Sequence, residues 1–219
     1  MPRIVFEKKG QAVWISHLDL MRLFQRAFKR AGLRLTHTQG FNPRPSVSIA
    51  LPLSVGVESV CELLDFDLDG EVVAPDEICN RLNSVLVPGV RVREVYETGR
   101  KLRDLAYLHV TIFMEYDNGI PDEGFASIKA LFASQELIVP KKGKNGVQDQ
   151  DIIPMIKSLD IQKTGERKLV FDGVICCQNP TLNPMQLPAA IALHLPQWKP
   201  DFATCRRLEI FDGNQNVFR

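Results

Sequence analysis

The sequence lacks the features of a secreted or membrane protein. Its 219 residues include only five cysteines, an odd number and too few for a disulfide scaffold in a chain of this length. No apolar run approaches the roughly 18 residues that a membrane-spanning helix needs. Residues 1–9 have neither the apolar core nor the small-residue cleavage site of a signal peptide. These absences predict a cytoplasmic protein with no membrane partner.

The common catalytic and cofactor motifs are missing too. The sequence contains no GxGxxG, GxxxxGK[ST], GxSxG or HExxH motif, and no CxxxCxxC motif for an iron–sulfur cluster. Cys176 and Cys177 are adjacent, so on a strand their side chains point to opposite faces and do not chelate one metal. We therefore expect neither a cofactor nor a metal in this chain.

What is present is the composition of an ordinary globular protein, 45% hydrophobic and 24% charged. The first 100 residues are predicted to run strand, helix, strands, helix, strand, the split βαβ or ferredoxin-like plan. The second half is expected to repeat that plan in diverged form. The predicted fold is therefore α+β, with two ferredoxin-like modules built on antiparallel sheets, at residues 1–100 and 105–219.

Three segments carry more specific expectations. Residues 12–15 are β-branched and aromatic, and are predicted to continue the first strand or to form a hairpin with it. Residues 141–150 are polar and contain glycine, which favours a mobile loop. Residues 152–159 are expected to form a short helix or turn.

The clearest element is a helix with a basic outer face. Ser16 is a good N-cap, Asp19 completes a capping box, and Gly32 supplies a left-handed stop. Apolar residues follow at helical spacing, and the opposite face carries the basic residues Arg22, Arg26, Lys29 and Arg30.

Charge is unevenly distributed along the first module. Residues 1–50 contain nine basic and two acidic residues, a net charge of +7, whereas residues 51–100 carry a net charge of −6. Such asymmetry indicates an anionic partner for the basic segment, or mutual neutralisation within one folded domain.

A rigid loop follows the basic helix, because two prolines fix its backbone. Together the helix face and loop are suited to hold a phosphate chain through Arg side chains and backbone N–H groups, and Phe41 is suited to stack on a base. The alternative is a capped helix and a turn whose residues only shape the turn. The loop residues of this candidate RNA- or partner-binding site are Gln39, Phe41, Asn42 and Arg44.

His17 is the leading candidate for acid–base chemistry. It occupies the first helical position, where the positive end of the helix dipole favours the neutral imidazole. Asp19 or His37 is a candidate to assist it as a general base. A histidine at the start of a helix is otherwise a structural residue.

Four segments resemble the radical SAM-linked protein family, an uncharacterised domain family encoded beside or fused to a cobalamin-domain-type radical SAM protein. They are residues 16–22 (SHLDLMR), 30–32 (RAG), 39–45 (QGFNPRP) and 53–59 (LSVGVES), so the specific match covers about the first 70 residues. The resemblance implies a bacterial cytoplasmic protein that works with a radical SAM partner on RNA or translation components. It supplies no established reaction and no catalytic residue.

The resulting hypothesis is a non-catalytic accessory protein that binds RNA, or presents it, for a radical SAM enzyme. One alternative is an RNA-processing or RNA-modifying enzyme that uses His17 as general base. Another is a docking module in which residues 39–45 contact the radical SAM protein. The oligomeric state stays open.

Overall fold

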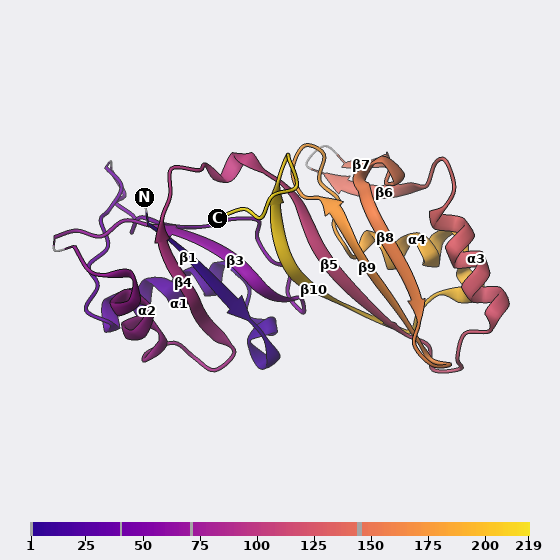
Figure 1. Ribbon diagram of the computed structural model, residues 1–219, viewed down its shortest axis with the longest axis horizontal. Helices are drawn as coiled ribbons and strands as arrows, with labels where there is room; N and C mark the ends of the chain where they lie inside the picture. Colours follow the sequence, from indigo (N-terminus) through magenta and orange to yellow (C-terminus); the bar gives the residue numbers. More distant parts are fainter. Residues whose placement is uncertain (1, 40, 71, 144–145) are drawn as a thin grey trace. The chain divides into compact units, whose positions relative to one another are not determined.

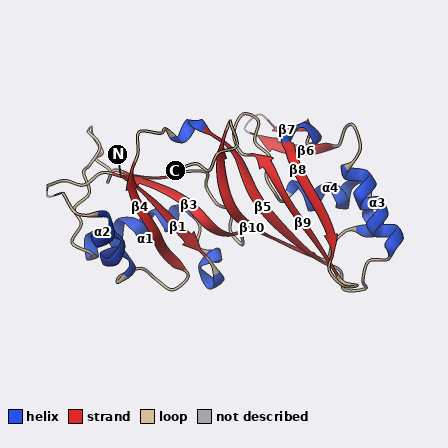
Figure 2. Cartoon of the chain, viewed as in Figure 1, coloured by secondary structure: helices blue, strands red, loops and turns tan. Residues whose placement is uncertain are grey.

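The computed structural model describes residues 2–39, 41–70, 72–143 and 146–219 (Figure 1). The chain divides into two compact units, Met1–Leu102 with Arg219, and Arg103–Phe218. Each unit combines helices with antiparallel strands, so the fold is mixed α+β (Figure 2). No helix in the described part of the chain is long and apolar enough to cross a membrane.

The first unit has four strands in the order β4-β1-β3-β2, and every neighbouring pair is antiparallel. Both helices pack on one face of this sheet, where Phe6 meets Phe24 and Phe28 meets Phe66 at ring separations of 4.7 and 5.0 Å. The elements are β1 (Pro2–Lys8), the 3-10 helix η1 (Gly10–Trp14), α1 (His17–Arg30), β2 (Val47–Ile49), β3 (Glu58–Phe66), α2 (Pro75–Asn83) and β4 (Val90–Glu97).

Helix α1 forms as its sequence predicts. The backbone N–H of Asp19 donates to Ser16 Oγ at 3.2 Å, which satisfies one donor that the first turn would leave open. The chain leaves the helix through Gly32 with φ of +70°, a left-handed conformation that favours glycine. Its apolar side is buried against the sheet and its basic side faces solvent.

The second unit has a four-stranded sheet in the order β10-β5-β9-β8, again antiparallel throughout, and a separate β6–β7 hairpin. Helix α3 packs on the sheet through Phe132, whose ring lies 5.1 Å from that of Phe171. The elements are η2 (Leu102–Asp104), β5 (Leu105–Glu115), α3 (Asp122–Phe132), β6 (Ile138–Gly143), β7 (Gly146–Asp151), η3 (Ile153–Met155), β8 (Ile156–Lys163), β9 (Lys168–Cys176), α4 (Gln186–His194), η4 (Pro196–Trp198) and β10 (Phe202–Asp212).

Three local predictions are wrong. Residues 12–15 do not extend the first strand, because Gly10 turns the chain with φ of +56° into η1. Residues 152–159 form η3 and the start of the edge strand β8. Because β8 carries many polar side chains, its sequence does not show the alternation of apolar and polar residues that predicts a strand. Residues 141–150 belong to the β6–β7 hairpin, apart from residues 144–145, which lie outside the described part of the chain.

Candidate anion-binding site

The outer face of α1 borders a hollow of about 440 Å³. Arg22, Arg26 and Arg30 line it at four-residue intervals, so their Cα atoms are about 6 Å apart along the helix axis. The opposite wall comes from the link between α2 and β4, which contributes Val85 and Val87. We call this space the arginine hollow; its other lining residues are Ile15, Asp19, Leu23 and Ala27.

Among the described residues, the carboxylate of Asp19 is the one that lines the arginine hollow, and it is already hydrogen-bonded. Asp19 accepts a hydrogen bond from the Ser16 hydroxyl at 2.7 Å and an ion-pair contact from Arg22 at 3.1 Å. These bonds, from Ser16 first and Arg22 second, lower the pKa of Asp19 below its ordinary value. Within the described residues Arg26 and Arg30 form no ion pair, so their guanidinium groups are available to an anionic ligand.

Lys29 does not line the arginine hollow. It lines a second hollow of about 500 Å³ together with His37, Arg34 and Pro45. The basic face predicted as one stripe is therefore divided between two hollows, with the three arginines in one and the lysine in the other.

The loop after this region is closed by its own backbone. His37 pairs with Pro45 across an isolated bridge, and Thr38 N–H donates to the Arg44 carbonyl at 2.8 Å. Gly40 lies outside the described residues. Gln39, Phe41, Asn42 and Arg44 are all exposed, and none of the four lines either hollow.

The structure does not bring His17 and His37 together. His17 begins α1, whereas His37 shares a hollow with Lys29, twelve residues further along the helix and about 18 Å along its axis. His17 Nδ1 is enclosed and has no hydrogen-bond partner among the described residues. Asp19, the other proposed assistant, is engaged with Ser16 and Arg22. An enzymatic role for His17 thus finds no assisting group in this arrangement.

His109, Thr111 and Asp172 form a polar cluster in the second unit that the sequence did not predict. His109 Nε2 lies 2.8 Å from Asp172 Oδ1, and the Thr111 hydroxyl donates to Asp172 Oδ2 at 2.8 Å. Partial burial would raise the pKa of Asp172, but the bonds from His109 and Thr111 outweigh it and lower that pKa. The sequence does show that His109 and Thr111 alternate on one strand and so share a face. It does not show that Asp172 of β9 lies opposite them, because that depends on the register between β5 and β9.

Other features of the arginine hollow also escaped the sequence analysis. Nothing in the sequence pairs Val85 and Val87 with α1, because these residues lie about 60 positions from the arginines.

No group of three or more His, Cys, Asp or Glu side chains in the described ranges is placed to hold a metal ion.

Comparison with known proteins gives a fold likeness and a family. No curated protein matches the chain. A chain in a crystal structure of a Cbf5-Nop10-Gar1 complex is similar with a TM-score of 0.55 at 10% identity, over 95% of this chain and 48% of that one. This chain thus spans about half the length of that relative, and the likeness concerns the fold alone. An unknown protein from Galdieria sulphuraria is 11% identical over 94% of this chain and 96% of that one, with a TM-score of only 0.27.

The family model described as "Uncharacterized protein conserved in bacteria (DUF2344)" matches residues 2–184, which include residues 2–102 of the first unit and both walls of the arginine hollow. The chain belongs to this bacterial family.

Proposed function

We propose that this protein is a non-catalytic accessory factor that binds RNA through the arginine hollow. The observation that carries the proposal is the row of Arg22, Arg26 and Arg30 on one wall of a hollow whose single carboxylate is already hydrogen-bonded. Arg guanidinium groups bind phosphate oxygens in a bidentate manner, and a row of them suits a ligand with several linked phosphates.

Binding of this kind depends mainly on charge. Each phosphate neutralised by an arginine releases condensed counterions, so affinity falls as salt rises. With three phosphates engaged, a fourfold increase in salt should weaken binding by roughly twenty- to fortyfold. The apolar wall of Val85 and Val87 adds contact area for sugar or base without adding charge.

The link to a radical SAM enzyme rests on the sequence resemblance. In this proposal the partner carries the iron–sulfur cluster and the chemistry in the cytoplasm, and this chain presents the RNA. We further propose that both units follow the ferredoxin-like plan. Support comes from their matching strand orders, β4-β1-β3-β2 and β10-β5-β9-β8, and from the helices that follow the first and third strands of each sheet.

The decisive experiment reverses the charge of Arg26 and Arg30. The Arg26→Glu, Arg30→Glu variant should lose at least tenfold in affinity for a mixed-sequence RNA measured by filter binding at low salt. A matched control is Arg167→Glu, Lys199→Glu, which makes the same change in net charge at two exposed positions of the second unit. Unchanged RNA binding by the α1 variant, or equal losses in both variants, would refute the proposal.

A second candidate function is docking to the radical SAM protein through residues 39–45. It is favoured by one observation: Phe41 is fully exposed at a loop whose ends are fixed by backbone hydrogen bonds. A pull-down with the radical SAM partner should then fail with Phe41→Ala and with Asn42→Ala, Arg44→Ala. Those variants should bind RNA as the parent does, which separates the two functions.

A further inference from the structure

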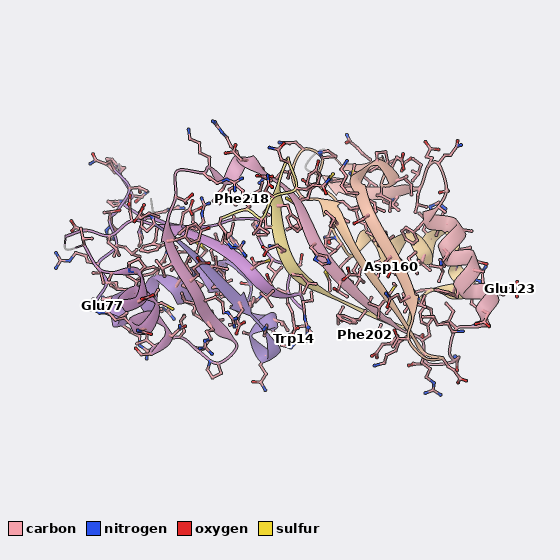
Figure 3. All side chains as sticks on the ribbon, in the orientation of Figure 1. Trp14, Glu77, Glu123, Asp160, Phe202 and Phe218 are labelled. Atoms are coloured by element: carbon pink, nitrogen blue, oxygen red, sulfur yellow. The ribbon has the colours of Figure 1, made fainter. Side chains whose placement is uncertain are left out.

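One aromatic side chain stands exposed where the chain enters the arginine hollow. Trp14 is 69% exposed and ends η1, and the next residue, Ile15, lines the hollow (Figure 3). An indole is among the largest apolar groups a protein has, and leaving it in water gains nothing for folding. The exposure of Trp14 therefore calls for a reason outside the core.

The backbone on both sides of Trp14 is held by a buried lysine. Lys8 Nζ donates to the carbonyl of Val13 at 3.1 Å and to that of Ile15 at 2.7 Å. Lys8 is fully buried, and burial lowers its pKa despite the attraction of the buried Glu62. Burying a lysine costs free energy, and a lysine is almost never fully buried without such partners. The two hydrogen bonds from Lys8 fix the backbone on both sides of Trp14.

A glycine supports the indole itself. A Cβ atom at Gly56 would lie 3.6 Å from the Trp14 ring, so the ring rests in contact range of the Gly56 backbone. Gly56 N–H also donates to the Val13 carbonyl at 2.9 Å, and its φ of +85° is one that favours glycine. The indole is thus backed on one side and open to solvent on the other.

Trp14 lies just ahead of the arginine row in the chain. It precedes His17, the first residue of α1, by three positions, its neighbour Ile15 lines the arginine hollow, and Leu18 in the first turn of the helix is 68% exposed. An aromatic platform and a line of cations are the two parts from which proteins build sites for unpaired nucleic acid strands.

We infer that the arginine hollow takes a single-stranded segment of RNA, with one unpaired base stacked on Trp14 and the adjoining phosphates on the arginine row. This inference rests on the proposed function and narrows its ligand. A paired base has no free face for the indole except at a helix end, and the major groove of duplex RNA is too deep and narrow for side chains to read.

Fluorescence provides a direct test, because the chain has only two tryptophans. In a Trp198→Phe background the emission comes from Trp14 alone. Titration with a short oligoadenylate should quench that emission with a saturating isotherm, whereas a long, fully paired RNA duplex, compared per phosphate, should bind at least fivefold more weakly. Stacking contributes about 1–3 kcal/mol per base, so Trp14→Ala should weaken oligoadenylate binding by at least about fivefold.

Two control variants sharpen the test. Trp14→Phe keeps an aromatic face and should retain most of the affinity. Phe202→Ala removes another exposed aromatic side chain, in the second unit, and should leave affinity unchanged (Figure 3).

The failures are distinguishable. If Trp14→Ala binds oligoadenylate like the parent while Arg26→Glu, Arg30→Glu does not, the platform is refuted and the RNA-binding proposal stands. If the parent binds neither oligoadenylate nor the paired duplex, both proposals are refuted. If Trp14→Ala leaves RNA affinity intact but abolishes capture of the radical SAM partner, Trp14 belongs to a protein interface and the inference is wrong.

Discussion

Each unit has a polar pair between the second and third strands of its sheet order, and the two pairs are buried to different degrees. In the first unit, Arg3 of β1 lies directly opposite Asp65 of β3 and binds it through two nitrogens. In the second unit, Thr111 of β5 lies directly opposite Asp172 of β9. Arg3 and Asp65 are buried, whereas the Asp172 side chain is 43% exposed.

This difference shows that strand register alone does not determine how much a polar pair contributes to stability. A buried ion pair has lost its hydration and depends on its partner, so breaking it is costly even when forming it gained little. A half-exposed pair exchanges its partner for water at small cost. The Arg3–Asp65 pair therefore contributes to the stability of the first unit. The hydrogen bonds of Asp172 can be replaced by water at little cost in free energy.

The tryptophans repeat this contrast. Trp198 in the second unit is half-buried and packs so closely on Gly124 of α3 that a Cβ there would lie 2.9 Å from the ring. Trp14 in the first unit has comparable backing from Gly56 but remains open to solvent. The indole of Trp198 packs within the second unit, whereas the indole of Trp14 is exposed to solvent.

The largest expected effect tests the buried pair. Asp65→Ala leaves the Arg3 guanidinium in the interior without its carboxylate and should lower the free energy of unfolding by about 3–5 kcal/mol. Urea denaturation followed by circular dichroism measures this. The double variant Arg3→Met, Asp65→Leu should recover much of the loss, and a cost below about 1 kcal/mol for Asp65→Ala would show that burial does not set the difference between the units.

A smaller effect is expected at the tryptophans. Trp198→Ala should cost about 2–3 kcal/mol of unfolding free energy, somewhat less than a fully buried tryptophan, because it removes half-buried packing. Trp14→Ala should change it by no more than about 0.5 kcal/mol. Thermal unfolding of the two variants side by side makes the comparison, and equal losses would mean that Trp14 is a packing residue.

A still smaller effect is expected for the half-exposed pair. Asp172→Ala should cost at most about 1 kcal/mol, since water replaces the bonds from His109 and Thr111. The same urea experiment as for Asp65→Ala gives the number. A loss as large as that of Asp65→Ala would contradict the contrast drawn between the two sheets.

The smallest effect is a shift in titration. Thr111→Val removes one of the bonds that lower the pKa of Asp172, so that pKa should rise toward its ordinary value. The stability that the lowered pKa provides is present above the ordinary carboxyl value and is lost as pH falls through the lowered one. In the variant this contribution should be smaller, and its loss should be complete at a higher pH. Carboxyl NMR titration of Asp172 measures it, with Thr204→Val as a control on the neighbouring strand.

Local signals were enough to predict helix α1 of the first unit. Ser16, the spacing of Leu20, Phe24 and Ala27, and the stop at Gly32 together predicted α1, because caps and periodicity act within one turn of helix. The prediction was wrong for residues 152–159, because an edge strand with polar side chains has its identity set by the partner strand β9.

The sequence predicted the basic residues of the candidate site but not its division into two hollows, because that division depends on residues distant in sequence. The sequence placed Arg22, Arg26, Lys29 and Arg30 on one exposed helix face, but it could not show that Lys29 faces a different hollow from the arginines. That division depends on which chain segments flank α1 on each side. His37 was expected to approach His17 because a helix and the strand that follows it pack together in the predicted plan, and the length of α1 separates the two residues.

The sequence by itself determined the class of fold, the basic helix and its ends, because these follow from side-chain type and spacing within a few residues. Only the tertiary structure decided that Val85 and Val87 wall the arginine hollow, that Lys8 fixes the backbone around Trp14, and that Asp65 is buried while Asp172 is not. Burial and long-range contacts are properties of the packed chain, since they depend on what lies opposite each residue and not on its neighbours in sequence.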